Sequence, residues 1–317
     1  MSKNKKQIII MSIIAIAFLT LYVVWGLTAK NYRFNLSLRI PKVLGILIAG
    51  GTISVASILF QTITNNRIIT PSVIGLDSLY SLVQTVVVFV FGSTSIFMVN
   101  KTINFLMSGT LMVLLSMILF KVVLKKGENN IFFLLLVGTV VGTLFRSMSS
   151  FMQVLIDPNE FDALQTKLYA SFSLVNTKII VVSILILIII AFVLFRSFNN
   201  LDVMSLGREQ AINLGVNYDK FSKKILIIVA ILVSLSTALV GPITFLGILV
   251  VNLTYEITKT YKHSVLLIVG TLISIIALVG GQFLVERVFV FNTTISIIIN
   301  FIGGIYFINL LLRESKL

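Results

Sequence analysis

Very few side chains in this 317-residue sequence could carry out chemistry of their own. The chain has no cysteine and a single histidine, His263, which excludes thiolate chemistry and metal centres built from several histidines of this chain. It lacks the G-x-x-x-x-G-K-[ST] phosphate loop, the G-x-S-x-G nucleophile motif and the H-E-x-x-H zinc motif. His263 follows Lys262 at a predicted helix end, where a loop or capping role is expected. We therefore expect no catalytic residue, no metal and no cofactor in this chain, and we do not expect an enzyme.

Two ionisable residues lie within long apolar runs, where a charge is costly and usually functional. Arg146 stands about 15 residues into the run 131–156, roughly 22 Å along a helix. It could line a transport pathway and attract an anionic substrate, or it could reach toward the membrane surface or pair with Asp157. Asp77 begins another apolar run, and we expect it to form structural hydrogen bonds near the cytoplasmic end of that helix.

A further polar candidate, Gln61, lies toward the inner end of the apolar run 43–66. Gln61 and Arg146 are therefore the candidate residues of a translocation path. The same run contains Gly45 and Gly50, and small residues of this kind allow close packing of membrane helices.

The elements that must position these residues are predicted to be transmembrane helices. Apolar residues make up 57% of the chain and charged residues only 11%, with a mean hydropathy of +1.08. A soluble domain contains about 25% charged residues. Runs of about 20 apolar residues each suffice to span a bilayer. The runs cover residues 7–29, 43–66, 78–100, 102–120, 131–156, 179–195, 225–255, 264–285 and 288–312.

The run 225–255 is too long for one span, and Gly241-Pro242 is expected to divide it because proline interrupts a helix. The fold class is therefore all-α, a polytopic membrane protein of about ten transmembrane helices in one domain, 1–317. The N-terminal run 7–28 could also be read as a signal peptide, but it is long and lacks a small-residue cleavage site, so we expect a retained span.

The net charge of +14 falls between the apolar runs, a pattern typical of membrane topology and not of a nucleic-acid surface. With both termini in the cytoplasm, 16 of the 25 Lys and Arg residues lie inside and eight outside, with Arg146 inside a span. Because positive residues favour the cytoplasmic side, this bias predicts cytoplasmic termini. The outside group that includes Arg39 and Lys42 runs against the rule, which suggests a function there.

One predicted cytoplasmic segment, 198–224, is patterned. It is expected to form two short helices separated by Gly207, with Gly215 at a helix C-terminus where glycine is favoured. Exposed apolar residues on two short helices favour docking of a soluble partner, although an ordinary interfacial loop would share the pattern.

Several motifs follow one another along most of the chain. They are R-I-P-K at 39–42, the small-residue helix that ends at Gln61, Val203–Val216, G-P-I-T-F-L-G at 241–247, Glu286-Arg287 and Gly303-Gly304. In this order and spacing they resemble the motifs of the FecCD-type permeases, which are membrane subunits of ABC importers for ferric siderophores, haem and cobalamin. One departure is Val251-Asn252, where the family usually has Pro-His.

The resemblance implies a permease subunit that moves iron–siderophore complexes, most similar to the catecholate or petrobactin-type permeases of Gram-positive bacteria. It implies a bacterial cell membrane location, a second permease subunit (a sister chain or a second copy), a pair of ATP-binding subunits that use the ATP, and an extracytoplasmic substrate-binding protein. It implies that the binding protein docks at Arg39, Lys42 and Arg287. The residues it implies for coupling to the ATPase are Leu206, Gly207, Ala211, Leu214 and Gly215.

Three alternatives stay open at this point. The same kind of importer could carry haem or cobalamin. An ion-coupled secondary transporter would show transport that depends on an ion gradient and not on ATP. A membrane-embedded enzyme is disfavoured because the sequence offers no catalytic constellation.

Overall fold

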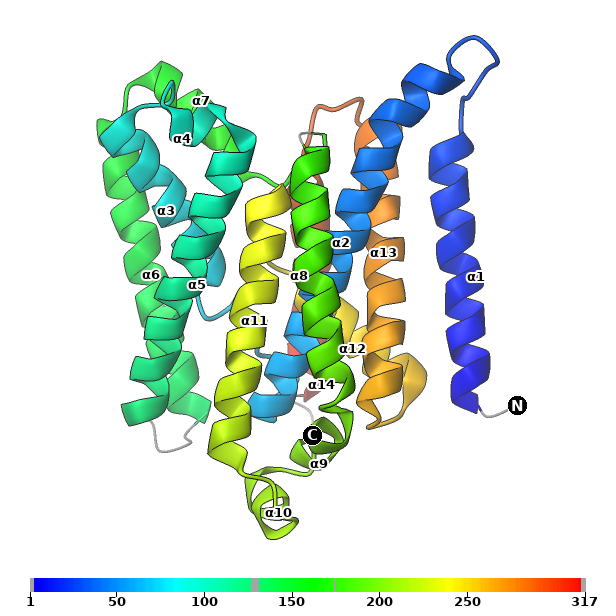
Figure 1. The fold of residues 1–317 in the computed structure, drawn as a ribbon, viewed down its shortest axis with the longest axis vertical. Coiled ribbons are helices and arrows are strands. Elements are labelled where there is room, and N and C mark those ends of the chain that lie inside the picture. Colours follow the sequence, from blue (N-terminus) through cyan, green and yellow to red (C-terminus); the bar gives the residue numbers. More distant parts are fainter. Residues whose placement is uncertain (1–2, 127–130, 174, 315–317) are drawn as a thin grey trace.

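The computed structural model describes residues 3–126, 131–173 and 175–314, and in these ranges every regular element is a helix. Eight long helices form the body of the bundle (Figure 1). They are α1 (Lys3–Val24), α2 (Tyr32–Thr64), α5 (Lys101–Lys126), α6 (Ile131–Leu155), α8 (Thr177–Phe195), α11 (Tyr218–Val240), α13 (His263–Arg287) and α14 (Ile295–Glu314). Shorter helices complete it: α3 (Leu76–Phe91), α4 (Ile96–Val99), α7 (Pro158–Leu168), α9 (Phe198–Met204), α10 (Arg208–Asn213) and α12 (Leu246–Thr258).

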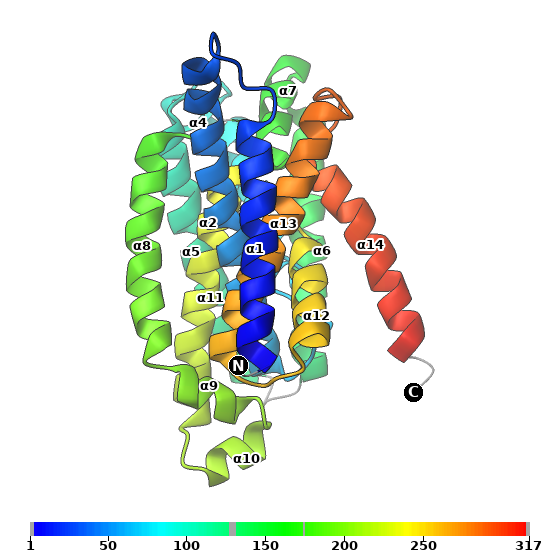
Figure 2. The ribbon, with the colours of Figure 1, turned by 90° about the vertical axis from the view of Figure 1, so that its right-hand side faces the viewer.

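The bundle has two distinct ends. Helices α9 and α10 project beyond the other helices at one of them, which we call the protruding end, and α1 begins on that side (Figures 1 and 2). Helices α4 and α7 and the connection from α1 to α2 lie at the opposite end. Long helices therefore run between the two ends, and the loops at each end bring together residues distant in the sequence.

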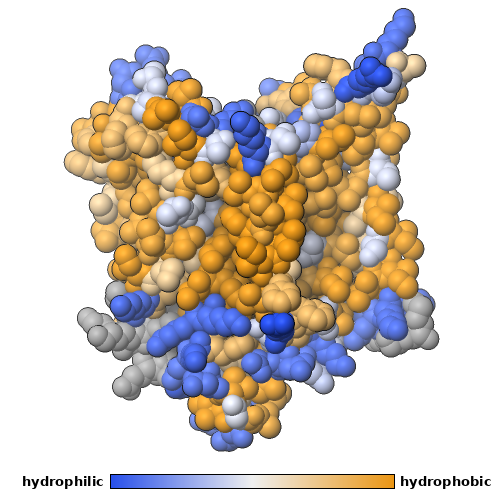
Figure 3. All heavy atoms as spheres, in the orientation of Figure 1, coloured by the Kyte–Doolittle hydropathy of each residue, from blue (hydrophilic) through white to orange (hydrophobic). Residues whose placement is uncertain are grey.

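Six helices in the described part of the chain are long and apolar enough to cross a membrane: α1, α2, α5, α8, α11 and α13. Shorter apolar helices cover Leu76–Phe91, Leu246–Thr258 and Ile295–Leu310. Figure 3 shows a broad hydrophobic band on one face of the molecule, with hydrophilic residues concentrated toward its two ends. Such a band suits a surface in contact with lipid, because the acyl chains offer no partner to exposed polar groups.

Helix α2 lies at the centre of the bundle and packs against α11 and α13. Small residues let the helices approach closely, as the sequence predicted. A Cβ atom added at Gly50 would lie 3.0 Å from the Ser274 hydroxyl, and one added at Gly270 would lie 2.6 Å from the Ser54 hydroxyl. Close approach of this kind stabilises membrane helices through van der Waals contact, since burial from lipid adds no hydrophobic gain.

The predicted break at Gly241-Pro242 is confirmed. Helix α11 ends at Val240, Gly241 has a φ of 97°, and α12 begins only at Leu246. A side chain at Gly241 would collide with the backbone of Ala170, 2.9 Å away. Glycine is thus needed for both its backbone conformation and its small size.

Two predicted boundaries are wrong. Helix α2 begins at Tyr32 and continues through Pro41, where the sequence predicted a loop before residue 43. Helix α14 begins at Ile295 and not at 288, because Val290 and Phe291 have positive φ angles of 48° and 62° and form a turn. Apolar content locates a span but does not report the backbone angles that end it.

Candidate functional site

Arg39 lies where the C-terminal end of α1 meets α2. It is 8% exposed, and its Nη1 donates to the backbone oxygens of Tyr22, Val23 and Trp25 at 3.3, 2.6 and 2.8 Å. Carbonyl groups at the end of a helix lack partners within the helix and carry partial negative charge. The guanidinium therefore caps α1 and fixes it to α2.

Lys42 lies one turn further along α2 and forms an ion pair. Its Nζ is 2.8 Å from Oε1 of Glu286, near the end of α13. The same carboxylate oxygen also accepts hydrogen bonds from the Tyr22 hydroxyl at 2.9 Å and the Gln282 amide at 2.8 Å. The Lys42 and Glu286 side chains are 16% and 10% exposed, so this pair is largely shielded from water. Glu286 thus links α1, α2 and α13 at the opposite end of the bundle.

Arg287 is exposed at the same end and lies beside Gly26. The structure therefore brings the three candidate docking residues to one end of the molecule. Two of them, Arg39 and Lys42, already have partners within the chain. Their docking role stays a prediction, and Glu286 is a residue whose importance the sequence analysis missed. The sequence analysis had named Glu286 only as part of the matching motif Glu286-Arg287, without a role of its own.

Arg146 lines an open cleft of about 320 Å³ between α3, α6, α7 and α14. Among the described residues no ion pair joins it to Asp157, whose carboxylate instead caps α7 by accepting from the backbone N–H of Asn159 at 2.9 Å. The cleft is unusually polar for the interior of an apolar bundle. Its polar side chains include Asp77, Ser78, Ser81, Arg146, Ser149, Ser150, Gln153, Tyr169, Thr244, Ser296 and Asn300.

Asp77 faces the same cleft and forms hydrogen bonds, as predicted. It accepts from the hydroxyls of Thr244 at 2.7 Å and Ser72 at 3.3 Å. Its predicted place at a cytoplasmic helix end is wrong. Gly75, just before α3, packs against Gly142 near the middle of α6, so α3 begins halfway along the bundle. Hydropathy did not reveal that the preceding loop enters the bundle.

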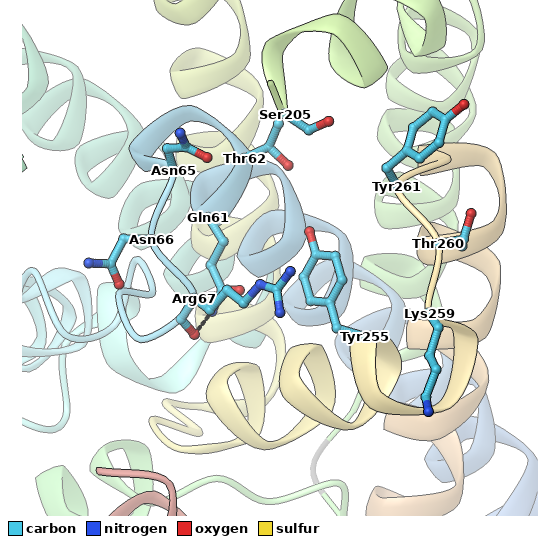
Figure 4. A pocket seen from close by; sticks show the side chains of 10 residues that line it. All are labelled: Gln61, Thr62, Asn65, Asn66, Arg67, Ser205, Tyr255, Lys259, Thr260 and Tyr261. Atoms are coloured by element: carbon cyan, nitrogen blue, oxygen red, sulfur yellow. Dashed lines mark hydrogen bonds between the residues drawn. The ribbon is translucent and has the colours of Figure 1, made fainter. Parts of the chain in front are cut away.

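Gln61 lines a second cavity, of about 490 Å³, near α9 (Figure 4). Its amide nitrogen donates to the backbone oxygen of Arg67 at 2.6 Å, and the Arg67 guanidinium lies 4.7 Å from the centre of the Tyr255 ring. Thr62 and Ser205 line the wall nearest α9. The two candidate path residues therefore face different cavities, Gln61 toward the protruding end and Arg146 in the cleft between α6 and α14.

The segment 198–224 contains two short helices, α9 and α10, as predicted, but its predicted end at 224 is wrong, because α11 already begins at Tyr218. Gly207 has a φ of 99° between them, and Gly215 has a φ of 86° after α10. Ala211 is fully buried, as are Leu201 and Met204, which anchor α9 in the core. In contrast, large apolar side chains on the protrusion remain exposed: Leu206, Ile212 and Leu214, at 54%, 48% and 62%.

His263 is the first residue of α13, as expected for a helix end, but it is fully buried. Its ring bonds Asp202 of α9 and Thr62 of α2. A loop or capping role was expected here. His263 lies in a helix and not in a loop, and the sequence did not predict that its ring is buried between α9 and α2. Asp202 carried no signal in the sequence. Among the described residues no cluster of His, Asp and Glu could hold a metal ion.

The model of the FecCD transport family matches residues 5–313. The chain belongs to this family. It is 54% identical over 314 residues to the Petrobactin import system permease protein YclO of Bacillus subtilis, covering 99% of both chains. It is 39% identical to the Petrobactin import system permease protein FatC of Bacillus anthracis, over 88% of this chain and 79% of that one.

The fold is also that of a solved transporter. A chain described as an ABC transporter of the metal-chelate type, in an inward-facing conformation, superposes with a TM-score of 0.81 and covers 98% of this chain and 99% of its own length. At 20% identity this similarity supports the fold alone.

Membership of the FecCD family decides among the three classes of protein that the sequence left open: ABC importer permease, secondary transporter and membrane-embedded enzyme. FecCD proteins are permeases, so this chain is a multi-pass transport component of a bacterial cell membrane and not an enzyme. The ion-coupled secondary transporter is set aside for the same reason.

Proposed function

We propose that this chain is the permease subunit of an ABC importer for a ferric siderophore of the petrobactin type. The observation that carries the proposal is the 54% identity to a petrobactin permease along the whole chain. In this proposal both termini are cytoplasmic and the chain crosses the membrane ten times, with the third crossing made by α3 together with the loop before it, which enters the bundle. The helices of these crossings are α1, α2, α3, α5, α6, α8, α11, α12, α13 and α14. An odd number of spans would place the termini on opposite sides of the membrane.

The second half of the permease is a different chain. YclO and YclN of Bacillus subtilis are both petrobactin import system permeases, but this chain is 54% identical to the first and 26% identical to the second. FatC and FatD of Bacillus anthracis show the same difference, 39% against 24%. The proposed assembly is therefore a heterodimer of this chain and a sister permease, with the translocation path between them.

Arg146 supplies positive charge to that path. Its side chain is exposed in the cleft between α3, α6 and α14, among hydroxyl and amide groups. A cation placed among hydrogen-bond donors suits an anionic, oxygen-rich metal chelate. Gln61 and the second cavity belong to the cytoplasmic exit in this proposal, since they lie beside α9.

The two ends of the bundle serve different partners. The exposed apolar residues Leu206 and Leu214 fit a groove of the ATP-binding subunit, with Gly207, Ala211 and Gly215 shaping the two short helices. The substrate-binding protein docks at the opposite end, where Arg287 is exposed. Arg39 and Lys42 hold α1, α2 and α13 together beneath it, and their charge helps to steer an acidic partner.

The test is uptake of iron-55 in cells that lack this gene and in cells with the gene restored, across petrobactin, a hydroxamate and a catecholate siderophore. Loss of petrobactin-dependent uptake alone, recovered on restoration, is expected. Unchanged uptake of all three chelates, in cells without a second petrobactin system, would contradict the proposal. Haem and cobalamin uptake would then be measured in the same strains.

A further inference from the structure

A buried polar contact joins the protrusion to two helices of the bundle. One carboxylate oxygen of Asp202, in α9, accepts from the backbone N–H of His263 at 2.7 Å and lies 2.7 Å from Nδ1 of the same residue. His263 is the first residue of α13, and Lys262, the residue before it, provides no side-chain cap. A side chain from α9 therefore supplies the N-terminal cap that α13 lacks locally.

The contact extends to a third helix. Nε2 of His263 lies 2.8 Å from the hydroxyl of Thr62, in the last turn of α2. The imidazole is fully buried and the Asp202 side chain is 25% exposed. Both ring nitrogens are thus engaged, one with α9 and one with α2. Hydrogen bonds to a carboxylate are shorter and stronger than those between neutral groups.

This contact lies beside the cavity near α9. Thr62 and Ser205 both line the cavity near α9, and Ser205 follows α9 directly (Figure 4). A displacement of α9 that is carried through Asp202 and His263 would move the first turn of α13 and the last turn of α2 together. The last turn of α2 borders this cavity through Thr62, and the connection that leads into α13 borders it through Thr260 and Tyr261.

We propose that Asp202 and His263 are positioning residues that transmit movement of α9 to α13 and α2, so that the cavity at the protruding end changes shape when the ATP-binding subunit moves α9. The inference rests on the proposed function, in which α9 and α10 meet that subunit. Apolar packing of Leu201 and Met204 keeps α9 attached in any case. The hydrogen bonds between Asp202 and His263 also fix the orientation of α9 relative to α13, which apolar packing alone does not do.

The first test compares Asp202→Ala, Asp202→Asn and wild type in the complete importer, reconstituted in lipid vesicles with binding protein and ferric petrobactin. Asp202→Ala removes both hydrogen bonds to His263, while Asn keeps an acceptor. Loss of a hydrogen-bonded charged group typically corresponds to about a tenfold change in an equilibrium. We therefore expect Asp202→Ala to lower chelate transported per ATP hydrolysed about tenfold, and Asp202→Asn to retain most of it.

A purely structural role would lower the yield or thermal stability of the complex and leave that ratio unchanged, and this result would overturn the proposal. The matched control is Asn200→Ala, an exposed residue of the same helix, which should leave the ratio unaltered. A reduced ratio in the control as well would also count against a specific role of Asp202.

The second test does not depend on the identity of the substrate. Because the chain has no cysteine, Asn199→Cys on α9 and Tyr261→Cys before α13 can carry spin labels without background, in a complex whose other subunits lack cysteine. We expect the same distance between the labels in the nucleotide-free and ATP-bound complex of wild type, and a distance that changes with nucleotide in Asp202→Ala. A distance that changes equally in both would overturn the proposal. Failure of petrobactin transport by the wild type, with the spin-label result intact, would contradict only the proposed substrate.

Discussion

At the scale of single residues, two positively charged side chains at the end opposite the protrusion bind groups of the protein itself. The sequence placed Arg39 and Lys42 in an outside loop, and the resemblance to the FecCD-type permeases made them candidates for docking. The structure has both on α2, one capping α1 and the other paired with Glu286. A sequence shows how many positive charges lie in a segment, but not which distant carbonyl or carboxylate accepts from them.

The ion pair between Lys42 and Glu286 is expected to stabilise the protein. Removing one partner leaves the other charge poorly compensated in a site shielded from water, which costs about 3 to 5 kcal/mol for a fully buried pair and less here, because both side chains keep some exposure. Lys42→Met should therefore lower the thermal unfolding temperature of the detergent-solubilised protein. Lys30→Met, at an exposed lysine, is the control. Equal unfolding temperatures of the two variants would show that the pair contributes little.

Arg146 is expected to act on the substrate and not on stability. Its side chain is exposed in the cleft, so Arg146→Gln should leave expression and complex assembly intact. If the cation attracts the chelate, a loss of one charge-assisted contact should lower the initial rate of iron-55 uptake about tenfold. Arg196→Gln, at the end of α8, is the matched control. Normal uptake by Arg146→Gln would place Arg146 off the path.

At the scale of elements, the sequence predicted the helices but not their depth in the bundle. The apolar runs located the central part of each span, and Gly241-Pro242 located the break before α12. The two short helices of the protrusion could also be predicted from the local sequence, because Gly207 and Gly215 both adopt the positive φ angles that favour glycine. The site depends on long-range contacts, such as Gly75 with Gly142 and Asp202 with His263, and these leave no periodic trace in a single sequence.

The contact between α6 and the start of α3 is too close for an added side-chain atom. A Cβ atom on Gly142 would lie 2.9 Å from the Cα of Gly75. Gly142→Ala should therefore destabilise the protein, by about 1 to 3 kcal/mol for overpacking. Gly304→Ala, in a helix with nothing within 4 Å of the added atom, should be neutral or slightly stabilising. The measurement is thermal unfolding of both variants, and equal stability would contradict the packing described here.

The protrusion should bind the ATP-binding subunit through its exposed apolar side chains. Leu214 is 62% exposed, so Leu214→Asp costs the isolated chain little but places a charge in the proposed interface. We expect it to reduce co-purification of the ATP-binding subunit several-fold, because a buried unpaired charge is costly. Asn199→Asp, on α9, controls for added charge. Undiminished co-purification of the Leu214→Asp variant would contradict this docking surface.

At the scale of the whole molecule, the proposed function assigns three tasks to three parts of the bundle. The protrusion lies at one end of the bundle (Figures 1 and 2). The cluster around Glu286 lies at the C-terminal end of α13, and the polar cleft with Arg146 lies between α3, α6 and α14. Composition alone predicted an all-helical membrane protein, because few charges and long apolar runs leave no other stable fold in lipid. It could not predict the cleft, which forms from polar residues scattered over five segments of the chain.

The most direct test of this account is transport by the purified importer. The chain, its sister permease, the ATP-binding subunits and the binding protein are reconstituted in vesicles, and uptake of ferric petrobactin is measured with ATP or a non-hydrolysable analogue, with and without an ionophore. We predict uptake that requires ATP hydrolysis and is insensitive to the ionophore. Uptake that continues without hydrolysis and stops with the ionophore would contradict it.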